Sequence, residues 1–145
     1  MRFSVAALSA AAALAACQPA PETAARDAWL RLPAVPGRPA AAYFTLESVN
    51  AKTLVGVSTP VAERSELHES SNDGGMMAMR PLASVPVEPD MPVRFAPGGK
   101  HVMLFDLTPQ AMQDARTTLT LRFEDGSALD VDAALVKAGE EPPFE

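Results

Sequence analysis

The stretch PLASVPVEPDMPVRFAP, residues 81–97, decides the fold class of this chain. It contains five of the fourteen prolines, spaced three to five residues apart. A proline inside a helix removes a backbone hydrogen bond and clashes with the preceding turn, so no helix can cross this stretch. On both sides of it, short apolar runs alternate with turn residues. Runs repeating every 8–12 residues or so are typical of a β-sandwich or Greek-key barrel, so we expect one all-β domain.

Nine of these runs are expected to form strands. They cover residues 29–32, 42–46, 53–57, 62–69, 77–82, 93–96, 101–105, 118–123 and 129–131. The only helical expectation is one turn at residues 109–114, after Thr108, a residue type that caps helices. The turn residues 124–127 predict a final hairpin.

The first 26 residues are expected to lie outside this domain. Residues 1–16 have the composition of an export signal, with one basic residue, a short apolar run and small residues before Cys17. Leu14-Ala15-Ala16-Cys17 resembles a bacterial lipobox, in which the cysteine is acylated, and acyl chains anchor a protein to a membrane. The alternative is an ordinary cleavage site beside an unmodified cysteine. We therefore expect a cleaved signal peptide at 1–16, a flexible linker at 17–26, a domain at 27–137 and an exposed acidic tail at 138–145, in a periplasm-facing, membrane-anchored lipoprotein.

Composition excludes several classes of function. Twelve basic against eighteen acidic residues give a net charge of −6, which disfavours nucleic acid, because phosphate contacts require a basic surface. The single cysteine allows no intramolecular disulfide. A phosphate-binding glycine loop, a nucleophile elbow and a zinc-protease helix are all missing from the sequence, and two histidines offer little acid–base chemistry. We expect a binding protein and no enzyme.

Methionine and histidine gather in one part of the chain. Five of the six methionines after the initiator lie in the 36-residue window 68–103, which begins at His68 and contains His101 near its end. His101 and Met103 are two residues apart on a predicted strand, so their side chains leave the same face. His68 and Met79 flank a turn expected at residues 70–75, which brings them close. The alternative is that these methionines fill gaps in the core.

The chemistry of these donors favours one ion. Thioether sulfur is a poor ligand for Mg²⁺, Ca²⁺ or Zn²⁺ and suits Cu(I). Methionine also binds without losing a proton and cannot form a disulfide, which is an advantage outside the cytoplasm. A set of two histidines and two methionines without a thiolate differs from a blue-copper electron-transfer site. We therefore predict one Cu(I) site at His68, Met79, His101 and Met103.

The same residues resemble the signature of the periplasmic PCuAC-type copper chaperones: His, ten residues, Met, twenty-one residues, His, one residue, Met. His68, Met79, His101 and Met103 meet every interval, and Asp-Gly-Gly and Pro-Gly-Gly flank them. This resemblance implies a cupredoxin-like β-sandwich that binds Cu(I) through those four side chains. It also implies copper delivery to the CuA centre of cytochrome c oxidase subunit II, directly or with a Sco-type protein.

Two departures from the family refine the expectation. Extra histidines after the first ligand are replaced by Ser70, Ser71 and Asn72, and the tail GEEPPFE lacks histidine and methionine, so we expect no Cu(II) site. Met77 is two residues from Met79 and is a possible auxiliary ligand. Three other functions stay open: copper buffering in the periplasm, a structural β-sandwich lipoprotein with a methionine core, and a copper oxidase. A monomer is expected.

Overall fold

The computed structural model describes residues 20–144 and is built almost entirely of strands. Its elements are β1 (Thr23–Arg31), β2 (Ala40–Ser48), β3 (Lys52–Ser58), β4 (Ala62–Asp73), β5 (Met76–Leu82), β6 (Val85–Val87), β7 (Val93–Phe95), β8 (Lys100–Leu107), a 3₁₀ helix (Pro109–Met112), β9 (Arg116–Phe123) and β10 (Ala128–Val136). The predicted signal peptide and Cys17 lie outside the described residues. Within residues 20–144, no helix is long and apolar enough to cross a membrane.

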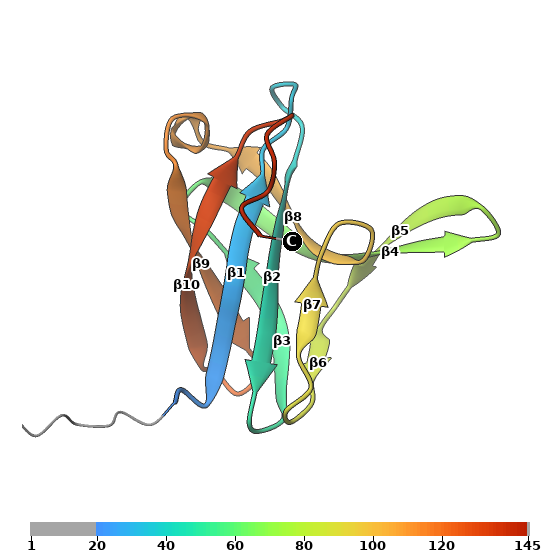
Figure 1. The fold of residues 1–145 in the computed structure, drawn as a ribbon, viewed down its shortest axis with the longest axis vertical. Coiled ribbons are helices and arrows are strands. Elements are labelled where there is room, and N and C mark those ends of the chain that lie inside the picture. The colour runs from blue at the N-terminus through green and yellow to red at the C-terminus, as the bar shows by residue number, and fades with distance from the viewer. Residues whose placement is uncertain (1–19, 145) are drawn as a thin grey trace, which may run out of the picture.

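The strands form one hydrogen-bonded ladder in the order β5-β4-β8-β7-β2-β1-β10-β9-β3-β6, with an extra pairing between β8 and β2. All neighbours are antiparallel except β1–β10 and β7–β8. The ladder curls so that strands from its two halves enclose one core (Figure 1). The predicted all-β class and single domain are confirmed.

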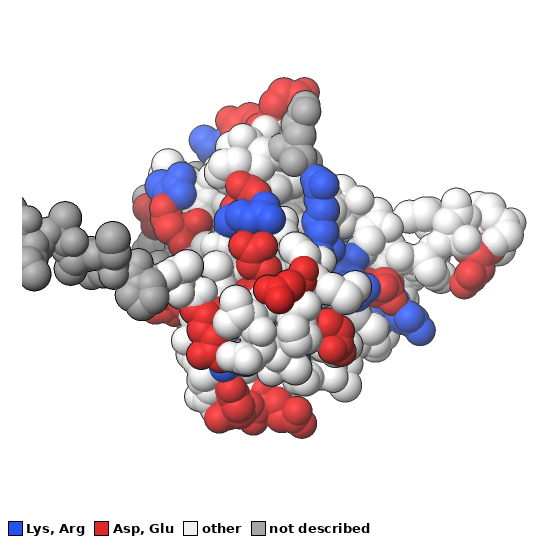
Figure 2. Space-filling model, turned by 60° about the horizontal axis from the view of Figure 1, so that its bottom comes forward, with Lys and Arg blue, Asp and Glu red and all other residues white. Residues whose placement is uncertain are grey.

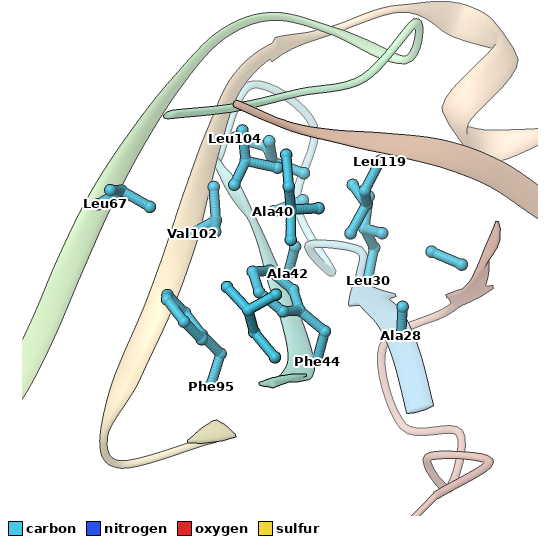
Figure 3. Close-up of a cluster of buried hydrophobic side chains, with 14 of the residues drawn as sticks. Ala28, Leu30, Ala40, Ala42, Phe44, Leu67, Phe95, Val102, Leu104 and Leu119 are labelled. Carbon is cyan, nitrogen blue, oxygen red and sulfur yellow. The ribbon is translucent and has the colours of Figure 1, made fainter. Parts of the chain in front are cut away.

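The core follows the two-residue period of the strands. Along β2, buried residues alternate with half-buried ones over its whole length. Phe44 stacks on Phe95 of β7 with ring centroids 4.4 Å apart, and both rings are 2% exposed. Leu67 of β4 and Val102 and Leu104 of β8 close the core on one side (Figure 3). β4 and β8 therefore each turn one face toward the core, and their other face points away from it.

Several element boundaries differ from the sequence prediction. β1 begins at Thr23, so the sheet starts four residues before the Asp27 boundary, and residues 23–26 are strand instead of linker. These residues pair with β2, a long-range contact that local composition does not reveal. The short strand β6 was missed because Pro86 lies at its centre. Pro86 is tolerated because β6 is the last strand of the ladder, where an edge needs no second partner.

The predicted helical turn is present as the 3₁₀ helix at Pro109–Met112. Thr108 occupies its N-cap position but makes no side-chain capping bond. Residues 138–144 are mostly exposed, yet this segment is tied to the sheet. Arg31 donates hydrogen bonds to the carbonyl oxygens of Lys137 and Glu140. Pro142 and Phe144 then line a cavity of about 270 Å³ over Trp29.

The outer parts of β4 and β5, beyond the pairing of β4 with β8, form a hairpin that projects from the body, which we call the arm (residues 70–79; Figure 1). β4 runs on to Asp73, beyond the strand expected at 62–69, so the turn expected at 70–75 shrinks to Gly74 and Gly75. Both glycines have positive φ, 65° and 87°, which a two-residue hairpin turn requires. At the base of the arm, Glu69 accepts hydrogen bonds from Arg80 of β5 and Lys100 of β8. This three-strand ion pair ties the arm to the body.

One ion pair outside the arm makes folding stability depend on pH. Lys52 donates a 2.7 Å hydrogen bond to Asp125, which holds the pKa of Asp125 well below its ordinary 3.8 and raises the pKa of Lys52 above 10.5. The stabilisation from the lowered carboxyl pKa is complete above pH 3.8 and is lost as the pH falls further; that from the raised amine pKa is lost above pH 10.5. We expect Asp125→Asn to flatten the acid limb of the stability curve.

Urea unfolding at pH 7 and pH 3 measures this effect, with Asp114→Asn, an exposed aspartate in the loop before β9, as the matched control. An acid limb equally steep in Asp125→Asn and in the unmutated chain would contradict the prediction.

Candidate metal centre

The two histidines lie side by side on the face of β4 and β8 that points away from the core. His68 is directly opposite His101 in the antiparallel pairing of these strands. Their ring centroids are 5.9 Å apart with the planes tilted by 31°. His101 is only 4% exposed, whereas His68 is half-buried. Two imidazoles at this separation can direct nitrogen lone pairs toward one ion.

Met103 joins the histidines by strand alternation. It is two residues from His101 on β8, so it shares the outward face, while Val102 and Leu104 point into the core. Its partner across β4 is Glu66, which places Met103 diagonally next to His68. Diagonal neighbours lie about 7–8 Å apart, within reach of a long side chain. β8 therefore has the two faces predicted for it, one with His101 and Met103 and one with the buried Val102 and Leu104.

Met79 lies on the same face but farther out along the arm. It is opposite Ser70, and His68 is opposite Pro81, so Met79 is diagonal to His68 on the side toward the arm's tip. Its side chain is 59% exposed. Met77 lies two pairs farther toward the tip and is 68% exposed. Figure 2 shows the arm standing clear of the body with few charged side chains on the visible face.

The two methionines of the predicted set therefore flank the histidines from opposite sides. Met79 and Met103 are separated by two strand spacings of about 4.8 Å and by four residue positions of about 3.3 Å each, which is roughly 16 Å between their Cα atoms on a flat sheet. Two extended methionine side chains do not cover that distance comfortably. Bending or extra twist of the two-stranded arm, where sheet twist is largest, is what would bring Met79 inward.

The ring of His101 is oriented by the loop before β8. Its Nδ1 lies 2.9 Å from the carbonyl oxygen of Gly99, and a carbonyl can only accept, so Nδ1 carries the hydrogen. The same oxygen accepts the backbone N–H of Ser70 from the arm. Gly98 has a φ of +83°, which allows the tight turn that presents this carbonyl. In neutral His101, Nε2 is then the nitrogen with a free lone pair.

His68 has a different environment. Its Nε2 is 2.9 Å from an oxygen of Glu66, two residues earlier on the same face. Its Nδ1 is buried and has no hydrogen-bond partner in the part of the chain that the structure describes. A buried nitrogen without a partner is costly in an apo protein and is a feature to be explained. A bound metal ion would satisfy it.

β4 carries an ionised glutamate on each of its faces, Glu66 beside the histidines and Glu69 on the reverse side. The hydrogen bond from His68, with the nearby charge of Arg64, holds the pKa of Glu66 below its ordinary 4.5, so this carboxyl is ionised at neutral pH. On the reverse face, Arg80 and Lys100 lower the pKa of Glu69 in the same way. The Glu66 carboxylate therefore places negative charge beside the imidazoles, and Arg64 lies close to it. A carboxylate at this position favours a cation over an anion at the site.

The donor set fits a soft monovalent ion better than a hard one. Among residues 20–144, no group of three or more His, Cys, Asp or Glu side chains is placed to hold a metal. On the face that carries His68 and His101, thioether sulfur from Met103 and from the arm is available to complete the coordination of an ion. Thioether and imidazole ligands without a carboxylate cluster suit Cu(I).

Sequence reasoning missed three contributors to this face: Glu66, Arg64 and the carbonyl of Gly99. A usable signal was present for two of them. Arg64, Glu66 and His68 are spaced two apart on a predicted strand, so they share a face by alternation. The role of a backbone carbonyl cannot be read from side-chain types.

Comparisons with known proteins identify the family and the fold. Residues 23–135 match the model of the LpqE-like family, described as "Putative lipoprotein LpqE-like". A curated relative from Leifsonia xyli subsp. xyli, "Putative lipoprotein Lxx21020", is 32% identical over 79 residues, which are 54% of this chain and 48% of the relative. The match thus spans about half the length of that relative.

Solved structures share the fold. The copper-bound PCuAC domain from PmoF2 is 22% identical, with a TM-score of 0.64 over 83% of this chain and 97% of that domain. Apo-DR1885 from Deinococcus radiodurans is 28% identical, with a TM-score of 0.61 over 96% and 95% of the two chains. The CuI form of DR1885 gives a TM-score of 0.62 at 28% identity over 88% and 85%. The family model covers most of the sheet, and the chain therefore belongs to the LpqE-like family, which is of the PCuAC type that its motif resembles.

Proposed function

We propose that this protein is a metallochaperone that binds one Cu(I) through His68, His101 and Met103, with Met79 as the fourth ligand supplied by the arm. The observation that carries this proposal is the facing pair of imidazoles, 5.9 Å apart, with a thioether on the same face. Copper is the ion in the copper-bound PCuAC domain and in the CuI form of DR1885, which share this fold.

The exposure of the site supports transfer of the ion instead of permanent retention. His68, His101 and Met103 lie where β4 pairs with β8 in the body of the sheet, whereas Met79 lies on the arm and is largely exposed. A partner with soft donors can replace the exposed ligand first while the body ligands still hold the ion. Each step then exchanges one ligand, so Cu(I) is never released free into solvent.

The destination we propose is the CuA centre of cytochrome c oxidase subunit II, reached directly or through a Sco-type protein. We further propose that the mature chain works as a monomer, facing the periplasm and anchored through acylated Cys17; Met77 serves as an auxiliary ligand near the arm's tip. The "lipoprotein" in the names of the family and of the Leifsonia relative supports the anchor. If copper buffering is the function instead, the Cu(I)-loaded chain will not metallate apo subunit II.

A competition titration under reducing conditions tests the copper site. We expect the mature chain to bind one equivalent of Cu(I), and His101→Ala to lose most of the affinity, because it removes a ligand that the Gly99 carbonyl already orients. Met112→Leu, an exposed methionine outside the arm, is the matched control and should bind normally. Because His101 is buried, circular dichroism must show that the variant is folded. A folded His101→Ala variant with unchanged affinity would refute the proposal.

A further inference from the structure

Glu66 and His68 form a hydrogen bond whose direction is set by chemistry. An ionised carboxylate has no hydrogen to donate, so Nε2 of His68 must carry the hydrogen in the 2.9 Å contact. In the neutral ring, the lone pair is then on Nδ1. That atom is buried and has no hydrogen-bond partner among the described residues. The nitrogen left free by Glu66 is therefore the one that lacks any other interaction.

His101 has the opposite arrangement. Its Nδ1 donates to the Gly99 carbonyl, which leaves Nε2 free. The two rings thus differ in which nitrogen keeps a free lone pair, one set by a carboxylate and one by the backbone. Imidazole ligands of metals commonly donate their other N–H to a carboxylate or a carbonyl, which sets the tautomer and the ring orientation. Both histidines have such a partner before any ion binds.

Glu66 is itself held in place. Arg64 hydrogen-bonds to the second carboxylate oxygen of Glu66, and its guanidinium lies 4.0 Å from the ring centroid of Phe105. Arg64 is opposite Phe105 and Glu66 is opposite Met103 in the pairing of β4 with β8. Phe105, Arg64, Glu66 and His68 therefore form a continuous row on the outward face, which begins on the rigid body and ends at the site. A row of this kind restricts the carboxylate to one orientation.

We propose that Glu66 is a positioning residue of the copper site: by accepting the Nε2 hydrogen of His68, it makes Nδ1 the copper donor and fixes the ring toward His101 and Met103. This inference rests on the proposed function for the identity of the ion. Glu66 does not bind the ion; it selects which nitrogen does.

Nitrogen-15 NMR of the histidine side chains tests the assignment directly, because two-bond correlations distinguish protonated from unprotonated ring nitrogens. In the apo chain we expect His68 as the Nε2–H tautomer and His101 as the Nδ1–H tautomer. On addition of Cu(I), Nδ1 of His68 and Nε2 of His101 should shift. Coordination of His68 through Nε2 would overturn the proposal.

Three variants separate positioning from general effects. Glu66→Ala should give mixed His68 tautomers and a roughly 10- to 100-fold weaker Cu(I) affinity, the usual cost of losing an outer partner of a metal ligand. Glu66→Gln keeps an oxygen acceptor and should preserve the tautomer and most of the affinity. Glu63→Ala removes an exposed carboxylate of the same strand and should change neither.

The outcomes also distinguish this inference from the proposed function. If His101→Ala abolishes Cu(I) binding while Glu66→Ala changes neither tautomer nor affinity, Glu66 has no positioning role and the copper site stands. If the unmutated chain binds no Cu(I), the proposed function fails, and with it the inference. A pure folding defect in Glu66→Ala would lower thermal stability, and Glu66→Gln would then not restore the tautomer.

Discussion

Replacing Met103 by leucine should remove tight Cu(I) binding while leaving the fold intact. Leucine has nearly the volume of methionine, and such swaps usually cost less than about 1.5 kcal/mol of stability. Met103 is only half-buried on the outward face, so its loss does not open the core. The thioether, however, is a soft donor on the rigid body, on the same face as both histidines. We expect the Cu(I) affinity to fall by more than about 100-fold, which is the upper end of the loss for a residue that only hydrogen-bonds to a metal ligand.

Met79→Leu provides the internal comparison. Because Met79 is diagonal to His68 on the exposed arm, its contribution depends on bending of the arm. We therefore expect a smaller loss of affinity than for Met103→Leu and faster transfer of copper to an acceptor. Both are measured by competition titration and stopped-flow transfer, with thermal unfolding as the check on folding.

Equal copper binding by Met103→Leu, Met79→Leu and the unmutated chain would contradict the carrier function. It would favour the structural alternative, in which these methionines only occupy volume. The exposure of Met77 and Met79 already argues against a core role for the arm methionines.

Phe44→Ala should be the most destabilising single change in the sheet. The ring is 2% exposed and stacks on Phe95, which is equally buried, at 4.4 Å. Truncating a buried phenylalanine costs about 3–5 kcal/mol, because apolar burial is lost and a cavity remains. Against a total stability of about 5–15 kcal/mol for a domain, this removes a large share.

Urea unfolding of the apo chain measures that loss, with Val35→Ala, an exposed apolar residue in the loop before β2, as the control. The control should change stability by less than about 0.5 kcal/mol. A loss below about 1 kcal/mol for Phe44→Ala would mean that the core does not depend on this stacked pair. Because β2 also pairs with β8 at Met103, a marked loss would also lower copper affinity near the unfolding midpoint.

The arm illustrates why strand prediction succeeded in part. The apolar and polar alternation of residues 101–105 predicted a strand with two distinct faces, and β8 has them. The polar run Ser70–Asp73 read as a turn, because it lacks apolar residues. It is strand in the structure because its backbone pairs with that of Met76–Met79. The two glycines between these segments are enough to form the connecting turn. The local composition of a segment does not show which strand it will pair with.

The site shows the same division. Residue types and spacing alone made His68, Met79, His101 and Met103 the candidate ligands and pointed to a soft ion, since alternation and donor chemistry are local properties. Only the tertiary structure decided that the two imidazoles face each other, that Glu66 and the Gly99 carbonyl set their free nitrogens, and that Met79 lies toward the tip of a projecting arm. The physical reason is that strand register and hydrogen-bond partners are long-range properties, set by how the whole ladder pairs and closes over its core.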